Sequence, residues 1–574
     1  MNKASIVNRS VAANFLDALY AQGIKYVFAN AGTDFAPVIE AMVLAAEQNR
    51  PIPRFITVPH ENVAISMAHG YYLATGEPVA VMVHVTVGTA NALCGLMNAS
   101  RDNAPILLMA GHTPSTETGH IGSRNAGIHW GQDSFDQGGI VREYVKWDYE
   151  LRAGQKVEDL VERALDIAMS EPRGPVYLHM PRELLGDQVR TEPRVPRQRP
   201  LGSRPAIPSR EAVQEAAEAI AEAEFPLIMT AYSGRDHENV AQLGRLATDF
   251  GIAVGIPFEP SSRELNIPSS HPMYIGMHPI DAISRADVII ALDCEVPWVP
   301  SIVTPRSDVF LIQMSADPFF SKYPIRGFEA DLPIAGSTAA ALAMLQETLQ
   351  TACADRRNLI ETRRETITAM GTARRQKLAT TMEDAATSRP IHPAWVAHCI
   401  NEIKKTDTII VNEIGVPLDF LELETPGTYF SSSLAGGLGF ALGASLGVKF
   451  GSPSSNVIVI LGDGSYMFGN PTATHFVARS QGLGTTTIVM NNQRWHAVHR
   501  STLAMYPDGK AAGVDLMPLV DLGPSPDYEK IIQACGGYGE RVEDPAELPG
   551  ALERALDANN QGIPALLNLI VQTP

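Results

Sequence analysis

The stretch "VIVILGDGSYMF", residues 457–468, decides the fold of this chain. Its first residues, Val457 to Leu461, form a short continuous apolar run, which is typical of a central strand in a parallel sheet covered on both faces. Asp463 then follows the carboxyl end of the predicted strand, where open α/β sheets bind their ligands. Because Gly462 and Gly464 flank it, the backbone could approach a bulky anion closely. A turn aspartate that caps the next helix is the alternative interpretation.

A second stretch, "TTTIVMNNQRW" at residues 485–495, ends another β-rich run in two amide side chains, Asn491 and Asn492. The interval after Gly464 is long enough for one crossover helix, so consecutive parallel strands would present Asp463 and the asparagine pair at one edge of a sheet. Carboxylate, amide and backbone oxygens are the ligands that Mg²⁺ accepts when phosphate oxygens complete its octahedron. Together the two stretches predict a site for a metal-bridged diphosphate.

The length and composition of the chain limit its class. A chain of 574 residues is too long for one core and predicts roughly three or four domains. A hydrophobic content of 45% and a charged content of 19% are typical of a globular protein. The formal net charge of −18 argues against a nucleic-acid or acidic-membrane partner, because such surfaces repel an acidic protein.

Cysteine usage and the N-terminal sequence bear on the compartment. The five cysteines lie far apart without a C-x-x-C pair, which fits a reducing compartment and disfavours a disulfide scaffold or a thiolate zinc site. Polar residues interrupt the N-terminal segment, and no run of about 18 apolar residues could span a bilayer. We therefore expect a cytoplasmic protein.

Apolar runs alternate with helical segments along the chain and predict parallel sheets with right-handed crossovers. A proline-rich stretch at residues 192–208 predicts a linker, and an arginine-rich stretch at 351–390 predicts a solvated linker helix, with phosphate binding as the alternative. Between them, "TAYSGRDHEN" stands where a dinucleotide-binding glycine fingerprint would belong and lacks that fingerprint, so we interpret the middle domain as structural. The predicted fold is α/β with three doubly wound parallel-sheet domains, at residues 1–190, 205–350 and 385–574.

The Gly-Asp-Gly-Ser sequence followed at this distance by Asn-Asn resembles the cofactor motif of thiamine-diphosphate-dependent enzymes. The resemblance implies that Asp463 and Asn492 ligate Mg²⁺, together with a backbone oxygen near Arg494. It also implies that Ser465 and the amide of Gly464 hold phosphate oxygens of thiamine diphosphate. The dipole at a helix N-terminus would favour the same anion.

The resemblance covers essentially the whole chain. It identifies the three predicted domains, in order, as pyrimidine-binding, middle and diphosphate-binding. Because the first and third domains of the family each hold half of the cofactor, family members place the site between two subunits. The resemblance therefore implies a homodimer or a homotetramer, and the sequence leaves that choice open, as it leaves open whether the middle domain binds a nucleotide.

A glutamate from the first domain is also needed in the family. The stretch "FITVPHENVAISMAHGYYLATG", residues 55–76, ends a predicted strand and begins a helix at His60-Glu61. Taken alone, Glu61 is a first-turn glutamate that complements a helix dipole. In the family the matching glutamate hydrogen-bonds N1′ of the aminopyrimidine and favours the imino tautomer, whose nitrogen removes the thiazolium C2 proton. The resemblance therefore makes Glu61 a catalytic and cofactor-binding residue.

The stretch "SSSLAGGLGFALGASLG", residues 431–447, is a third match. The resemblance implies that Gly437 lets the backbone approach the cofactor and that Leu438 is the bulky residue beneath it, which forces a V-shaped cofactor conformation. A glycine- and alanine-rich packed helix is the alternative interpretation.

A fourth match follows the strand predicted near the start of the third domain. The stretch "VNEIGVPLD" occupies residues 411–419. The resemblance implies that its turn supplies diphosphate contacts or the backbone oxygen that binds the 4′-amine. The residues concerned are Ile414, Gly415 and Val416.

The loop "VHVTVGTANALCGLMNA", residues 83–99, separates the branches of the family. Acetolactate synthases typically carry Gly-Pro-Gly near the position of Thr86 to Gly88, whereas this loop resembles benzoylformate decarboxylase. A histidine at position 84 could transfer protons to and from covalent intermediates, because the imidazole pKa lies near the working pH. A hydrogen-bonded histidine at a strand end is the alternative interpretation of His84.

Other segments depart from that decarboxylase. Gln132, in "GHIGSRNAGIHWGQDSFDQGG" at residues 119–139, stands in a Gln-acid pair similar to a segment of acetolactate synthases. His496 and His499 follow the metal loop, where family members build the substrate pocket. Exposed loop histidines without a role are the alternative for both.

The resemblance implies a thiamine-diphosphate- and Mg²⁺-dependent non-oxidative decarboxylase or carboligase that acts on a 2-oxo acid through a C2 carbanion and an enamine. Protonation would release an aldehyde, whereas an aldehyde or keto acceptor would give a ligated product. The alternatives are an acetolactate-synthase-like transferase and a lyase that cleaves a diketone or a 2-hydroxyacyl-CoA. Two further alternatives belong to other functional classes. One is a flavin- or nicotinamide-dependent oxidoreductase, and the other is a scaffold that binds the cofactor without catalysis. The identities of the acyl donor and acceptor stay open.

Overall fold

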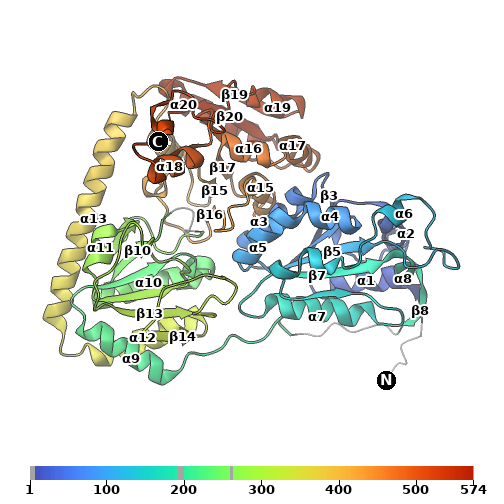
Figure 1. The fold of residues 1–574 in the computed structure, drawn as a ribbon, viewed down its shortest axis with the longest axis horizontal. Helices are drawn as coiled ribbons and strands as arrows, with labels where there is room; N and C mark the ends of the chain where they lie inside the picture. The colour runs from blue at the N-terminus through green and yellow to red at the C-terminus, as the bar shows by residue number, and fades with distance from the viewer. Residues whose placement is uncertain (1–6, 192–198, 259–262, 573–574) are drawn as a thin grey trace. The chain divides into compact units, whose positions relative to one another are not determined.

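The computed structural model describes residues 7–191, 199–258 and 263–572. Contacts divide the chain into two compact units. Unit 1 consists of Met1–Arg204, Ser433–Pro453 and Thr472–Gln481, and unit 2 consists of Pro205–Ser432, Ser454–Pro471 and Gly482–Pro574. The described part of the chain forms three six-stranded parallel sheets with helices against them, one sheet in unit 1 and two in unit 2 (Figure 1). The predicted α/β fold with three parallel sheets is confirmed.

The sheet of unit 1 has the strand order β3-β2-β4-β5-β7-β6, and a separate antiparallel pair joins β1 to β8. Its apolar runs are strands as expected, and the short strand β6 was not predicted. The strands are β1 (Val7–Ser10), β2 (Tyr26–Ala29), β3 (Arg54–Thr57), β4 (Val79–Val83), β5 (Ile106–His112), β6 (Asp148–Glu150), β7 (Val176–Pro181) and β8 (Gln188–Thr191).

The helices of unit 1 include α15, which comes from a much later part of the sequence than most of this unit and packs on α3. The helices are α1 (Val11–Ala21), α2 (Ala36–Glu47), α3 (Glu61–Thr75), α4 (Val85–Asn91), α5 (Leu93–Arg101), α6 (Ile128–Gly131), α7 (Val157–Met169), α8 (Arg182–Gly186), α15 (Phe440–Gly451) and, except for its first residue, α17 (Pro471–Ser480).

Glycines make the contact between α3 and α15 possible. A Cβ atom at Gly70 would lie 2.0 Å from the carbonyl oxygen of Ala444, and one at Gly447 would lie 1.8 Å from that of Met67. Any larger residue would therefore push the helices apart. The alternative interpretation of a glycine- and alanine-rich packed helix is correct for α15 itself.

The first sheet of unit 2 has the order β11-β10-β9-β12-β13-β14. Buried aliphatic side chains fill its strands, and helices cover it (Figure 1). Its elements are α9 (Arg210–Glu222), β9 (Pro226–Thr230), α10 (His237–Phe250), β10 (Ala253–Ile256), β11 (Tyr274–Met277), α11 (Ile280–Arg285), β12 (Val288–Leu292), β13 (Phe310–Ser315), β14 (Leu332–Ala335) and α12 (Thr338–Ala352).

The second sheet of unit 2 has the order β16-β15-β17-β18-β20-β19. In its register Gly462 of β17 pairs with Met490 of β18, so the residues that follow both strands lie at one edge, as predicted. Its elements, with the long helix that precedes them, are α13 (Arg357–Ala385), α14 (Pro393–Ile403), β15 (Ile409–Glu413), β16 (Tyr429–Ser431), β17 (Val457–Gly462), α16 (Asp463–Phe468), β18 (Thr486–Asn491), α18 (His496–Met505), α19 (Tyr528–Ala534), β19 (Tyr538–Val542), α20 (Leu548–Asn560) and β20 (Ala565–Ile570).

Helix α13 forms where an arginine-rich linker helix was predicted, but one of its arginines is not solvated. Arg363 is 1% exposed, and its guanidinium donates to the carbonyl oxygens of Phe250 at 3.3 Å and of Ile220 at 3.1 Å. These carbonyls lie at helix ends, where backbone acceptors lack partners within the helix. The prediction of a solvated helix is therefore wrong for Arg363, which ties α13 to the first sheet's helices.

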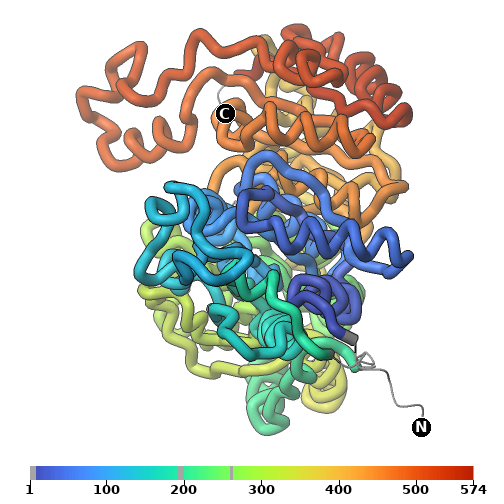
Figure 2. Tube along the Cα trace, turned by 90° about the vertical axis from the view of Figure 1, so that its right-hand side faces the viewer, coloured from blue at the N-terminus to red at the C-terminus, as the bar shows by residue number. Residues whose placement is uncertain are grey.

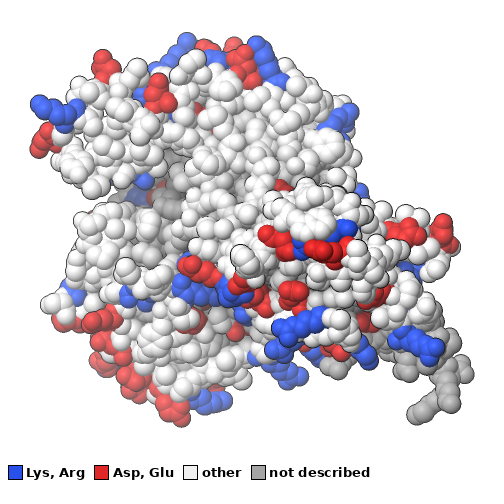
Figure 3. Space-filling view, turned by 45° about the vertical axis from the view of Figure 1, so that its right-hand side comes forward, with Lys and Arg blue, Asp and Glu red and all other residues white. Residues whose placement is uncertain are grey.

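Of the helices that the structure describes, none is both long enough and apolar enough to cross a membrane. Acidic and basic side chains lie side by side on the face drawn in Figure 3. The domain boundaries 1–190, 205–350 and 385–574 stay a prediction, and residues 192–198 of the predicted linker lie outside the described residues.

Candidate active site

Asp463 lies at the first position of α16, directly after β17, and its side chain is 2% exposed. Its two oxygens accept hydrogen bonds from the backbone N–H groups of Gly464 at 2.9 Å and Gln493 at 2.8 Å. Burial raises the pKa of Asp463 to about 6, although these N–H groups act in the opposite direction. The carboxylate is thus buried without a cationic hydrogen-bond partner among the described residues, which is the environment that a bound cation would complete.

The structure separates the roles of the two asparagines. Asn491 is fully buried, and its amide donates to Ser525 and to Asn568, both at 3.0 Å, so it belongs to the packing around the sheet. Asn492 is half-buried, and its Oδ1 accepts from the N–H of Arg494 at 3.1 Å. The carbonyl oxygen of Arg494 accepts from the N–H of His496 at 2.9 Å and keeps a second lone pair. These positions favour Asn492 over Asn491 as the oxygen donor.

Residues after Asp463 lie close to the aromatic ring of Trp495. A Cβ atom at Gly464 would lie 2.1 Å from this ring, so only glycine fits here. Ser465 is buried in the same turn of α16. Because the N–H of Gly464 donates to Asp463, its predicted contact with phosphate requires a change of partner.

The turn after β15 is strained in the way that binding sites often are. Ile414 has φ of +53° and an exposed fraction of 49%, which is unusual for a large β-branched residue. Oδ1 of Asn412 accepts from the N–H groups of Gly415 at 3.1 Å and Val416 at 3.2 Å and fixes the turn. The strain and the exposed side chain favour a role in binding for this turn.

His496 and His499 lie on α18, which has no buried residue and belongs to a segment that projects after β18 (Figure 2). Their rings stack with centroids 6.4 Å apart. Burial lowers the pKa of His496, and the positive charges of Arg500, His499 and Arg494 add to this effect. Nδ1 of His496 has no hydrogen-bond partner in the described residues and could accept a proton or a substrate hydrogen bond.

In unit 1, Glu61 is the first residue of α3, and the preceding His60 caps the helix. Oε2 of Glu61 accepts from the side-chain amide of Asn91 at 2.6 Å. A Cβ atom at Gly88 would lie 3.4 Å from Oε1 of Glu61, so the glycine leaves room beside the carboxylate. The half-buried glutamate is thus oriented and accessible, as a hydrogen-bonding partner for a ligand must be.

His84 follows β4 and is held on both sides of its ring. Nδ1 donates to the carboxylate of Asp34, and Nε2 lies 3.2 Å from the side-chain nitrogen of Gln132. The hydrogen bond to Asp34 raises the pKa of His84 above its ordinary value, although burial opposes it. Oε1 of Gln132 is buried without a partner, so rotation of this amide would let Oε1 accept from protonated Nε2. This arrangement can take up and release a proton at Nε2.

The backbone around His84 is built for this contact. A Cβ atom at Gly32 would lie 2.1 Å from Nδ1 of His84, and one at Gly111 would lie 1.8 Å from Oδ2 of Asp34. Val85 has φ of +30°, a conformation that costs a β-branched residue about 1–3 kcal/mol. Glycine at two positions and strain at a third therefore accommodate the paired histidine and aspartate.

Gly437 and Leu438 precede α15 in unit 1. The backbone N–H and carbonyl of Gly437 bond to the side chain of Asn98 at 3.0 and 2.8 Å, and Leu438 is half-buried. A Cβ atom at Gly437 would lie 2.8 Å from this amide. The close backbone approach is directed at Asn98 in this structure, and contact of Leu438 with a cofactor stays a prediction.

Sequence reasoning missed Asp34. This residue belongs to the 3₁₀ turn Thr33–Phe35 after β2, and β2 pairs with β4, so Asp34 and His84 meet at one edge of the sheet. The signal in the sequence is the carboxylate in "ANAGTDF", residues 29–35, directly after an apolar run. Asp463 likewise follows an apolar strand at the carboxyl edge of its sheet.

Comparisons with known proteins agree with these features. Residues 9–140 match the model of the thiamine pyrophosphate enzyme N-terminal binding domain, and residues 416–569 match that of the C-terminal binding domain. The chain is 26% identical to benzoylformate decarboxylase of Pseudomonas aeruginosa over 98% of this chain and 99% of that protein. It is 24% identical to a probable acetolactate synthase large subunit of Methanocaldococcus jannaschii over 98% of this chain and 91% of that protein.

Solved structures show the same fold. A thiamine-diphosphate-dependent 4-hydroxybenzoylformate decarboxylase of Rhodococcus jostii aligns with a TM-score of 0.77 at 21% identity, covering 99% of this chain and all of that one. Benzoylformate decarboxylase from Polynucleobacter necessarius aligns with a TM-score of 0.77 at 18% identity and covers 99% of each chain. With both cofactor-binding domains matched, the chain belongs to the superfamily of thiamine-diphosphate-dependent enzymes that includes benzoylformate decarboxylase and acetolactate synthase.

Proposed function

We propose that this protein is a thiamine-diphosphate- and Mg²⁺-dependent non-oxidative decarboxylase or carboligase that acts on a 2-oxo acid. The observation that carries the proposal is the imidazole of His84, paired with Asp34 and facing Gln132 at the sheet edge where Glu61 also lies. A proton donor and acceptor at this position suits a reaction in which a carbon atom must be protonated after CO₂ leaves. The names of the relatives, which include decarboxylases of benzoylformate, support the same reaction class.

The cofactor assignments follow the chemistry of the side chains. We assign the Mg²⁺ to the oxygens of Asp463, Asn492 and the backbone of Arg494, because carboxylate and carbonyl oxygens are the ligands of a hard cation. The raised pKa of Asp463 supports this, since a cation would stabilise the buried carboxylate. Bound thiamine diphosphate would supply a nucleophilic carbon and an electron sink for decarboxylation.

The other assignments concern the organic part of the cofactor and the substrate. Glu61 would hydrogen-bond the aminopyrimidine, and the strained turn after β15 would bind the cofactor through its backbone. His84 would exchange a proton at Nε2, and Gln132 would orient it. The remaining positions assigned to the cofactor or the substrate are Gly415, Val416, Gly437, Leu438, Gly464, Ser465, His496 and His499.

We propose a homodimer or homotetramer in the cytoplasm, in which the pyrimidine-binding residues of one subunit and the diphosphate-binding residues of another complete each site. The chain carries both cofactor-binding domains, so two copies could supply both halves of two sites. Analytical ultracentrifugation with and without cofactor tests the proposal, and a monomer that remains active would contradict it.

An acetolactate-synthase-like transferase is the second candidate. Gln132 and the neighbouring Asp133 support it, because the latter carboxylate accepts from Thr113 at 2.8 Å and from Arg124, which fixes the segment that carries Gln132. The amide of Gln132, carried beside His84 by this fixed segment, could orient a second carbonyl substrate. The two candidates differ in whether a proton or a second carbonyl reacts last.

The test is to incubate the pure protein with thiamine diphosphate and Mg²⁺ and to follow products by NMR with benzoylformate and pyruvate, separately and together. Benzaldehyde from benzoylformate is the expected result. Acetolactate or acetoin from pyruvate would favour the transferase. If the cofactor binds but neither acid is consumed, the 2-oxo acid class is wrong, and diketones and acyl-CoA esters are tested next.

A further inference from the structure

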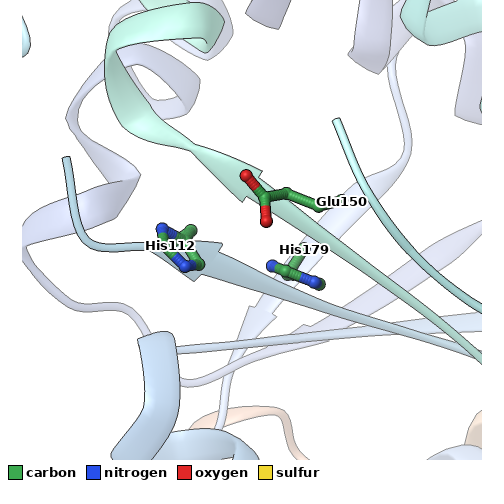
Figure 4. Close-up of side chains that lie close together, drawn as sticks. All are labelled: His112, Glu150 and His179. Atoms are coloured by element: carbon green, nitrogen blue, oxygen red, sulfur yellow. The ribbon is translucent and has the colours of Figure 1, made fainter. Parts of the chain in front are cut away.

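Three side chains that the proposed reaction does not use meet on the neighbouring strands β5, β7 and β6 of the unit 1 sheet, near the carboxyl ends of these strands. His112 ends β5, Glu150 ends β6, and His179 lies in β7 between those strands. In the parallel register, Glu150 is opposite His179, and His179 is opposite Ala110, two residues before His112. Because side chains alternate along a strand, the three lie on one face of the sheet. Figure 4 shows the Glu150 carboxylate turned toward the space between the two rings.

The tautomer of His112 is fixed by the backbone. Its Nδ1 lies 2.7 Å from the carbonyl oxygen of Thr113, which can only accept, so Nδ1 carries the proton. The lone pair is therefore on Nε2. A backbone carbonyl that holds the other ring N–H is the usual outer contact of a metal-binding histidine.

His179 is 5% exposed, and its Nδ1 is buried without a hydrogen-bond partner in the described residues. Its ring centroid lies 5.4 Å from that of His112. A neutral imidazole cannot form an ion pair with Glu150, but it can donate a lone pair to a metal ion.

Glu150 has an exposed carboxylate, and no hydrogen bond or ion pair joins it to any residue that the structure describes. The nearby Asp148 differs, because Arg142 binds it at 2.9 Å. One carboxylate of β6 is therefore neutralised within the chain and the other remains available.

We propose that His112, His179 and Glu150 bind one divalent transition-metal ion, with Zn²⁺ as the best match. Two imidazoles and one carboxylate form a common zinc ligand set that leaves a position open to water. The ligand atoms all lie within 4.8 Å of one another. Bonds of about 2.0–2.2 Å bring ligands to roughly 3–3.5 Å apart, so the widest separation must shorten by up to about 1.5 Å. Rotation of the exposed Glu150 side chain can bring its carboxylate closer to the two rings.

This site differs in chemistry from the proposed magnesium site. Asp463 and Asn492 offer only oxygen atoms, which suit a hard cation, whereas the cluster offers two imidazole nitrogens, which favour Zn²⁺. Excess Mg²⁺ should therefore fill the first site without displacing a metal from the second. The two sites can be tested independently in one sample.

The experiment uses untagged full-length protein, stripped with a chelator and reloaded with thiamine diphosphate and excess Mg²⁺. Zn²⁺ is then titrated in competition with a chromophoric chelator. We expect one tight site per chain. Glu150→Gln and His112→Gln should each weaken it by about tenfold or more, because even outer contacts of metal ligands contribute that much. Glu143→Gln, an exposed carboxylate of the same region, should leave the affinity unchanged.

X-ray absorption at the zinc edge distinguishes the sites directly. The expected spectrum contains scattering from two imidazole rings, and this scattering should decrease in His112→Gln. An all-oxygen shell, no tight site in the wild type, or an affinity that Glu150→Gln leaves unchanged would each overturn the proposal. Because Glu150 is exposed, its variant should fold, and circular dichroism verifies this.

Discussion

Two aspartates, Asp34 in unit 1 and Asp463 in unit 2, occupy the same kind of position in different environments. Each follows a strand at the carboxyl edge of a parallel sheet, and each is 2% exposed. Asp34 binds the imidazole of His84, whereas Asp463 binds only backbone N–H groups, and burial raises its pKa to about 6. The charge of a buried carboxylate that is paired with a histidine is compensated within the chain. A buried carboxylate that is held only by neutral groups needs a cation from outside to compensate its charge.

The largest effect should come from Asp463→Asn. Loss of a metal ligand removes several kcal/mol of charge stabilisation, which corresponds to a decrease of about 10³-fold in cofactor-dependent turnover. Steady-state kinetics at saturating Mg²⁺ measures it, and the exposed Asp508→Asn in the same unit is the matched control. Turnover within a few-fold of wild type would show that Asp463 does not hold the metal.

Glu61→Gln should lower turnover by about 10²-fold while the cofactor still binds, because the variant keeps its shape but cannot favour the imino tautomer. Among the described residues, the hydrogen bond to the Glu61 carboxylate comes from Asn91, and a glutamine can still accept it, so the substitution should not affect folding. Turnover and thermal unfolding are measured together. Unchanged turnover would favour the scaffold interpretation.

Asp34→Asn should act through the pKa of His84. The carboxylate raises this pKa, so its loss should move the alkaline limb of the kcat/KM profile to lower pH and reduce activity at pH 8 by about tenfold. The stability that the pair contributes is present below the unfolded histidine pKa of about 6.5 and is lost as pH rises through the higher folded pKa. The kcat/KM profile of His84→Phe should have no such alkaline limb. If the alkaline limb of Asp34→Asn stays at the wild-type pH, Asp34 does not set the pKa that controls activity.

The smallest effect concerns the stability of the cofactor-free protein. Because the folded pKa of Asp463 is raised to about 6, its unfavourable contribution is nearly absent at pH 4, develops as pH rises from about 4 to 6, and is complete above pH 6. Asp463→Asn should therefore stabilise the apoprotein by about 1–2 kcal/mol at pH 8, after the loss of one hydrogen bond, and should not stabilise it at pH 4. Urea unfolding at both pH values measures this, and destabilisation at pH 8 would mean that a cationic partner is already present.

The sequence predicted the sheets and the position of Asp463 because both follow from local patterns. Continuous apolar runs define buried parallel strands, and a polar residue directly after such a run must lie at the sheet edge. The assignment of Asn492 to the metal stays a prediction, which the burial of Asn491 beside Asn568 supports.

Contacts between distant segments could not be predicted. Asp34 and His84 are 50 residues apart, and they meet only because β2 pairs with β4. The cluster of His112, Glu150 and His179 likewise depends on the strand order β5-β7-β6, which no local pattern determines. Arg363 looked solvated because its partners are backbone carbonyls, which carry no sequence signal.

Calorimetric titration of thiamine diphosphate with Mg²⁺ into the wild type, Asp463→Asn and Asp34→Asn tests the central claim most directly. The wild type and Asp34→Asn should bind with similar affinity, because Asp34 serves the proton at His84 and not the cofactor. Asp463→Asn should lose the Mg²⁺-dependent part of the affinity. Equal binding by all three proteins, or loss in Asp34→Asn alone, would contradict the assignment of Asp463 to the metal and of Asp34 to the histidine.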